Sequence, residues 1–119
     1  MKKYTVNIND NINTVVEKIL INGQRTVLVV EKEKTLGVIS EGDILKSLVY
    51  KKNFNANLNS IMNKNFKFLK YKNFDDKDVE KIFTSHLCQI VPVLDKNLKL
   101  KEIITLEQFL KRKFKTNQK

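Results

Sequence analysis

GVISEGDI, residues 37–44, places a glycine and two apolar residues before a Ser-Glu-Gly-Asp turn and a new apolar run. Val38 and Ile39 favour the end of a strand, and Ser40 followed three residues later by Asp43 is a capping box, which begins many helices. The same residues suit a second purpose, because a helix start attracts phosphate and a carboxylate accepts hydrogen bonds from ribose hydroxyls. The stretch predicts a strand-to-helix junction and leaves open whether Asp43 also binds a ligand.

The elements around this junction occur twice in the chain. TVLVVE (26–31) matches IVPVLD (90–95), and Ser40 matches Thr105, so the second copy has one more residue between its paired strands. Each copy has the order β-α-β-β-α and is too small to bury its own sheet. We therefore expect an α+β fold of two repeats packed sheet to sheet with pseudo-twofold symmetry. The predicted strands are 4–8, 26–31, 36–40, 66–69, 89–95 and 101–105, with helices after the first, third, fourth and sixth of them.

Four segments follow from this repeat. Residues 1–50 form the first repeat and residues 59–114 the second. Residues 51–58 form a connector that has no glycine or proline, so we expect it to belong to the same domain. Residues 115–119 form a basic tail or the start of a linker.

The composition is that of a folded domain without catalytic machinery. Of 119 residues, 41% are hydrophobic and 30% are charged, and no apolar run approaches the ~18 residues that a membrane span needs. Cys88 is the only cysteine, which favours a reducing cytoplasm. One cysteine and one histidine, His86, supply neither a zinc site nor a set of converging catalytic groups. We expect no enzyme activity, no metal and no cofactor.

The formal net charge of +10 raises the possibility of a polyanionic partner. Of the 23 basic residues, however, only Arg25 and Arg112 are arginine, the side chain that phosphate recognition usually recruits. The lysines are spread along the chain, which is typical of a solvated surface. A nucleic-acid-binding domain is therefore the weakest of the functional hypotheses.

The doubled architecture, together with the motif Gly37-Val38-Ile39-Ser40-Glu41-Gly42-Asp43-Ile44, resembles the tandem cystathionine-β-synthase (CBS) domain pair, also called the Bateman module. The resemblance covers the chain from about Tyr4 to Leu110. It implies a regulatory module that binds adenosine nucleotides in clefts between the two repeats and forms a homodimer.

The resemblance also implies roles for particular residues. Thr26 and Val27 would contact the base, Asp43 would bind the ribose, and Ser40 would lie near the ribose or the phosphates. Arg25 would either reach a phosphate or remain solvated. These residues form the predicted nucleotide site, and the resemblance implies no metal or catalytic residue.

The second repeat predicts a weaker site. Thr105 and Gln108 repeat the capping box, but glutamine replaces the acid. Gly37, which would let a ligand approach the backbone, matches Lys101 or Glu102, and a carboxylate there would repel phosphate. We expect one competent site in the first repeat and a weak or empty one in the second. The rival hypothesis is a dimerisation scaffold that binds no ligand.

The opening of the chain and GVISEGDIL are also similar to the CBS pair that precedes some sugar-phosphate nucleotidyltransferase domains. This similarity implies an attached or partner transferase and a chain that is a fragment of a longer protein. For the dimer, we expect contacts on the outward helix faces around Ile44, Leu48, Phe109 and Leu110.

Overall fold

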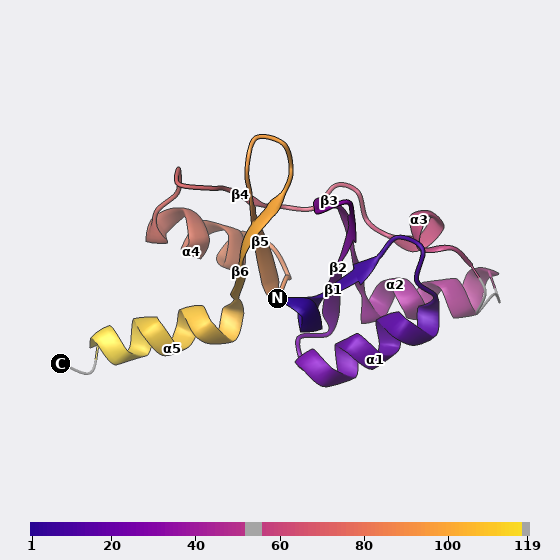
Figure 1. Ribbon diagram of the computed structural model, residues 1–119. Coiled ribbons are helices and arrows are strands. Elements are labelled where there is room, and N and C mark those ends of the chain that lie inside the picture. Colours follow the sequence, from indigo (N-terminus) through magenta and orange to yellow (C-terminus); the bar gives the residue numbers. More distant parts are fainter. Residues whose placement is uncertain (52–55, 118–119) are drawn as a thin grey trace. The chain divides into compact units, whose positions relative to one another are not determined.

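The structure is a computed structural model that describes residues 1–51 and 56–117 (Figure 1). The chain folds as two compact units, Met1–Phe66 and Lys67–Lys119. Residues 52–55 of the expected connector and residues 118–119 of the expected tail lie outside the described part. These two units are defined by contacts within the structure. The predicted boundaries, after residue 50 and before residue 59, were drawn between repeats in the sequence, so they stay a prediction. None of the described helices is long and apolar enough to cross a membrane.

The first unit is a three-stranded sheet whose longer helices lie on one face (Figure 1). In chain order its elements are η1 (a 3-10 turn, Lys2–Tyr4), β1 (Thr5–Asn7), α1 (Ile12–Asn22), β2 (Thr26–Glu31), β3 (Lys34–Ser40), α2 (Glu41–Lys46), η2 (a π-helical turn, Ser47–Lys51) and α3 (Leu58–Ile61). The middle strand is β2, which pairs with β1 in parallel and with β3 in antiparallel.

The core of the first unit lies between this sheet and its helices. Helix α1 begins at a side-chain cap, since the Asn11 side chain accepts from the N–H of Thr14, and it ends at Gly23, whose φ of 68° is left-handed. Leu20 of this helix is 78% exposed, so it lies outside the buried apolar face. The buried apolar residues of this core are Val6, Ile12, Val15, Ile19, Val27, Val29, Ile39, Ile44 and Leu58.

The second unit repeats the plan with a smaller sheet. Its elements are β4 (Leu69–Lys70), α4 (Asp76–Ser85), β5 (Ile90–Leu94), β6 (Leu100–Thr105) and α5 (Leu106–Asn117). The leading strand was predicted over 66–69 and is shorter and later, and α5 continues through 115–117, where a tail was expected. The core joins Val79 of α4 and Phe109 of α5 to Val91 and Val93 of the middle strand β5.

Strand register confirms the internal repeat residue by residue. Thr26 pairs with Ser40 in the first unit, and the matching residues Ile90 and Thr105 pair in the second. The strand that leads each unit runs parallel to the middle strand in both cases. The α+β class and the β-α-β-β-α order are therefore confirmed, whereas the packing of the repeats against each other stays a prediction.

The hairpins also carry the one-residue difference that the sequence predicts. Val30 pairs with Thr35 in the first unit, and Leu94 pairs with Leu100 in the second, so the second loop is longer by one residue. The pairing register shifts at equivalent places, between Val29 and Val30 and after Val93. A shared irregularity of this kind is a feature of the repeat, because bulges fix how a strand bends.

Candidate functional site

Ser40 and Asp43 form the predicted capping box at the start of α2. The Ser40 hydroxyl oxygen accepts from the N–H of Asp43 at 3.2 Å, and Asp43 Oδ2 accepts from the N–H of Ser40 at 2.9 Å. Oδ2 also accepts from the Ser40 hydroxyl at 3.1 Å. Capping alone explains why a serine occupies position 40, and the cap contributes about 1 kcal/mol to stability.

The carboxylate of Asp43 has a second oxygen that the cap does not use. Within the described residues, Oδ1 of Asp43 accepts no hydrogen bond, whereas Oδ2 takes part in both bonds from Ser40. The side chain is only half-buried, so a ligand can reach it. A carboxylate oxygen accepts hydrogen bonds only, which suits it to the hydroxyl groups of a sugar.

The structure brings the other predicted residues to the same end of the sheet. Thr26 lies opposite Ser40 in the β2–β3 ladder, and the carbonyl of Arg25 accepts from the N–H of Glu41 at 3.0 Å. The side chain of Arg25 is exposed, and its φ of 60° marks a left-handed turn just before β2. Val27 is different, because its side chain is buried in the core beneath the helices, so only its backbone can face a ligand.

The face of Gly37 is filled by the chain itself. Asn63 pairs with Val38 next to Gly37, and a Cβ built on Gly37 would lie 2.9 Å from the Asn63 carbonyl oxygen and 3.0 Å from the Met62 side chain. The expectation that this glycine opens the backbone to a ligand is corrected: the missing side chain makes room for residues 62–63. Sequence alone does not show this contact, since it joins residues far apart in the chain.

Replacing Gly37 with alanine should therefore destabilise the first unit by about 1–3 kcal/mol, since overpacking forces the neighbouring backbone to move. Urea unfolding followed by circular dichroism measures the change. Gly42→Ala is the matched control, because its Cβ would meet nothing closer than the Ser40 hydroxyl at 3.6 Å. We expect the control to be neutral or slightly stabilising. Equal stability of Gly37→Ala and the wild type would contradict this account.

The second repeat keeps the cap without the acid. The N–H of Gln108 donates to the Thr105 hydroxyl oxygen at 3.0 Å, and the N–H of Thr105 donates to Oε1 of Gln108 at 3.3 Å. The carbonyl of Gln89 accepts from Leu106, as that of Arg25 does in the first repeat. In the strand register Glu102 takes the place of Gly37. The predicted second site thus has the geometry of a helix start and no carboxylate at the position of Asp43.

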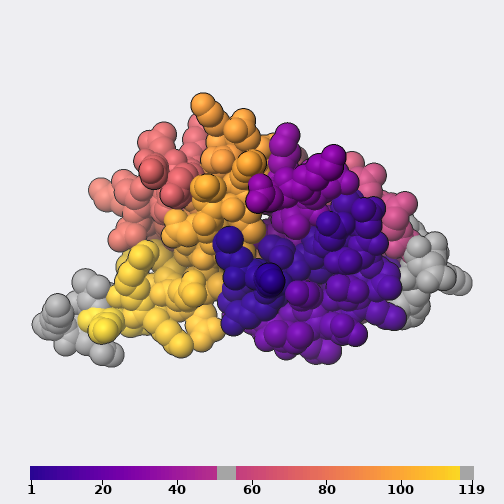
Figure 2. All heavy atoms as spheres, viewed as in Figure 1, coloured from indigo at the N-terminus to yellow at the C-terminus, as the bar shows by residue number. Residues whose placement is uncertain are grey.

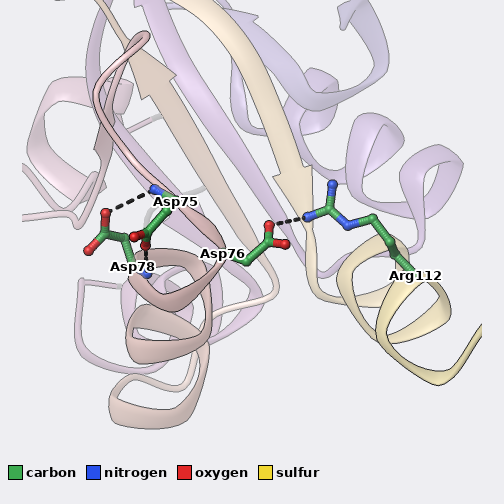
Figure 3. A network of polar contacts seen from close by, with 4 residues as sticks. All are labelled: Asp75, Asp76, Asp78 and Arg112. Atoms are coloured by element: carbon green, nitrogen blue, oxygen red, sulfur yellow. Dashed lines mark hydrogen bonds and ion pairs between the residues drawn. The ribbon is translucent and has the colours of Figure 1, made fainter. Parts of the chain in front are cut away.

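The three aspartates at the start of α4 make hydrogen bonds or an ion pair with other residues of the chain (Figure 3). Asp75 and Asp78 form a capping box with hydrogen bonds of 3.0 Å, and Asp76 lies 3.0 Å from Arg112 of α5. Lys113 and Glu80 make a second ion pair between the same helices. Among residues 1–51 and 56–117, no group of three or more histidine, cysteine or acidic residues is placed to hold a metal ion.

Cys88 and His86 lie at the entry to β5. Burial raises the pKa of the Cys88 thiol, which disfavours the nucleophilic thiolate. His86 is the exposed C-terminal cap residue of α4. These positions fit structural roles for both residues.

A feature that the sequence interpretation missed lies at the other end of the second sheet. Aromatic and basic side chains meet around a hollow between the β4–α4 loop and the β5–β6 hairpin. The sequence signal is FKFLKYK (66–72), where aromatic residues and lysines alternate. The alternation was interpreted only as a strand.

Residues 1–50 match the family model of the CBS domain. Three solved structures share the fold of the chain. The first is a candidate archaeal homologue of g-AMPK from Methanocaldococcus jannaschii, with 23% identity and a TM-score of 0.80 over 91% of this chain and 43% of that one. The second is a candidate signal-transduction protein with CBS domains from Burkholderia ambifaria, with 22% identity and a TM-score of 0.77 over 94% of this chain and 82% of that one. The third is CBSX2 in complex with AMP, with 16% identity and a TM-score of 0.78 over 95% of this chain and 88% of that one. The chain spans less than half the length of the first of these. Among curated proteins, none matches it in sequence.

The first repeat is therefore a CBS domain by its sequence, and the chain as a whole has the fold of a CBS-domain pair. The resemblance inferred from the GVISEGDI motif and the doubled architecture is confirmed. CBS-domain pairs are regulatory modules and not enzymes, in agreement with the expectation for this chain.

Proposed function

We propose that the chain is a regulatory module that binds one adenosine nucleotide, of the AMP, ADP or ATP class, beside Asp43. The observation that carries the proposal is the divided use of that carboxylate: Oδ2 caps α2, while Oδ1 stays available at a half-buried position. A cap needs no acid, as Gln108 shows in the second repeat. The free oxygen of the acid in the first repeat therefore supports a role for Asp43 beyond capping.

The neighbouring residues suit the remaining parts of a nucleotide. Asp43 would accept from the ribose hydroxyls, Ser40 would face the ribose or the phosphates, and the backbone of Thr26 and Val27 would contact the base. The exposed guanidinium of Arg25 either reaches a phosphate or stays in solvent. CBSX2, which has the same fold, was solved in complex with AMP, and this supports an adenosine nucleotide as the ligand class.

A thermal-shift series with AMP, ADP, ATP and S-adenosylmethionine tests the proposal. A ligand that binds only the folded chain stabilises it by about 2.7 kcal/mol at a hundredfold excess over its dissociation constant. We expect at least one adenine nucleotide to raise the melting temperature. If none of these compounds raises the melting temperature, the rival hypothesis, a dimerisation scaffold that binds no ligand, would stand. That rival draws support from Ser40 and Gly37, which the structure explains without a ligand.

We also propose that the chain forms a homodimer through the outer surface of the first unit. Large apolar side chains are exposed there, and a hollow of about 250 Å³ lies between α1 and α2. Exposed apolar clusters of this kind mark interaction surfaces. The predicted contact residues need correction, because Ile44 and Phe109 are buried in the cores. Leu20 and Leu45 line this hollow and are exposed, and the first unit exposes three further apolar residues, Ile21, Val49 and Tyr50.

Leu20→Glu combined with Leu45→Glu should convert the dimer into a monomer, because two carboxylates would be buried in the contact. Sedimentation equilibrium of the whole chain measures the mass. Leu87→Glu is the control, since Leu87 is fully exposed and belongs to the second unit. A monomeric wild type, or a double variant that remains dimeric, would refute the assignment.

The regulated partner remains part of the proposal. The similarity of GVISEGDIL to CBS pairs ahead of nucleotidyltransferases supports an attached or partner transferase, and the single Cys88 supports a cytoplasmic location. Binding to nucleic acid is the remaining alternative, supported by the net charge of +10. This alternative predicts that the chain binds nonspecific DNA and that its affinity falls steeply as the salt concentration rises.

A further inference from the structure

The second unit contains a hollow of about 570 Å³ at the end of its sheet. The walls come from the β4–α4 loop and from the β5–β6 hairpin, whose loop projects at the surface (Figure 2). Small-molecule sites occupy roughly 300–1,000 Å³, so the volume suits an organic ligand and exceeds what a bare ion needs. All of its lining residues belong to the second unit, whereas Asp43 belongs to the first.

One part of the wall is apolar and partly aromatic. Phe68 is 39% exposed, Leu98 is 43% exposed, and both line the hollow together with the buried Leu94. A flat ring and two leucine side chains offer a surface against which a planar apolar group can pack.

The rest of the wall is positively charged. Lys70 and Lys96 line the hollow, and the ammonium groups of Lys72 and Lys101 lie 5.4 and 5.3 Å from the ring centroid of Tyr71, another lining residue. A tyrosine ring attracts cations, so Tyr71 has two ammonium groups within cation–π range. None of these four lysines forms an ion pair with an acid in the described part of the chain.

The carboxylate that lines the hollow is already engaged. Asp95 Oδ1 accepts from the N–H groups of Asn97 at 2.8 Å and Lys99 at 3.0 Å. The hydrogen bond from Lys99, together with that from Asn97 and the charges of Lys101 and Lys99, holds the pKa of Asp95 below its ordinary value. Asp95 therefore shapes the hairpin loop, and it is the one acid among the described residues that line the hollow.

We propose that this hollow binds a small organic anion with a flat ring, the ring against Phe68 and Leu98 and a phosphate or carboxylate group on the lysines. The juxtaposition carries the proposal: a ring wall, a volume of ligand size, two lining lysines and two more lysines beside the lining Tyr71 occur at one place. Its lining residues differ from those of the proposed nucleotide site, and the proposal does not depend on that site.

Nuclear magnetic resonance titration of the whole chain with 1-naphthyl phosphate tests the proposal. We expect the amide shifts to centre on 68–73 and 95–98. Inorganic phosphate and 1-naphthol, which each lack one half of the probe, should bind at least about tenfold more weakly, a loss of ~1.4 kcal/mol. Shifts centred elsewhere, or 1-naphthol binding as tightly as the probe, would overturn the proposal.

Variants separate a built site from general attraction of anions. Lys96→Gln with Lys101→Gln should weaken binding of the probe, whereas Lys77→Gln with Lys81→Gln, exposed lysines of α4, removes the same charge and should not. Phe68→Leu should weaken binding while keeping an apolar side chain. Asp43→Asn should leave the titration unchanged, so the two proposals can fail independently. Equal losses in both lysine pairs would refute the site.

Discussion

Replacing Leu58 with alanine should lower the free energy of unfolding of the first unit by about 2–5 kcal/mol, the cost of removing a large side chain from a packed core. Leu58 is 0% exposed and packs in the core of the first unit. It begins α3, which Asn57 caps by accepting from the N–H of Ser60 at 3.0 Å. The short helix α3 thus completes the core of the first unit, although it follows all three strands of that unit's sheet in the sequence.

Urea unfolding, with an amide of β2 as the reporter, measures this change in the first unit. Leu87→Ala is the matched control, because it removes the same atoms from a side chain that is fully exposed. The control should change stability by less than about 0.5 kcal/mol. If Leu58→Ala costs no more than the control, α3 is not part of the core that the structure shows.

Asp43→Asn should weaken binding of the adenine nucleotide by about tenfold or more, or ~1.4 kcal/mol, while changing the stability of the chain little. Asparagine keeps one oxygen that can accept from Ser40, so the cap survives. Its amide nitrogen takes the place of the free Oδ1 and can only donate. The substitution thus removes the acceptor proposed for the ribose and spares the capping role. Calorimetric titration with the nucleotide that gives the largest thermal shift measures the loss.

Asp78→Asn is the control for this variant. Asp78 accepts from the N–H of Asp75 at 3.0 Å, as Asp43 accepts from Ser40 at 2.9 Å, so both changes remove a carboxylate from a capping box. Only the change at Asp43 should affect affinity. Equal affinity in Asp43→Asn and the wild type would mean that the acid serves the cap alone.

Much of the fold follows from local sequence. Helix caps at Asn11, Ser40 and Asp75 appear where the residue types predict them, because a cap depends on a few consecutive residues. The offset between the repeats predicts the register of both hairpins, since matching apolar patterns require matching pairs of strand residues. The end of the sheet that carries Arg25, Thr26 and Ser40 could be assembled from the same alignment.

Contacts between distant segments could not be predicted in this way. Gly37 was interpreted as an opening for a ligand, but Met62 and Asn63 occupy that space. Leu20 is apolar and follows the buried Ile19 in α1, but it is 78% exposed and outside the first unit's core. In both cases the residue type indicates which surroundings suit the side chain. Which residues surround it depends on where a distant part of the chain folds.

The most direct measurement is an amide-resolved magnetic resonance titration of the whole chain with AMP. The account predicts saturable shifts that centre on Arg25, Thr26 and the start of α2 from Ser40 to Asp43, with much weaker changes around Thr105 and Gln108. Shifts centred on the second repeat, or no shifts with AMP, ADP or ATP, would contradict a single nucleotide site built on Asp43.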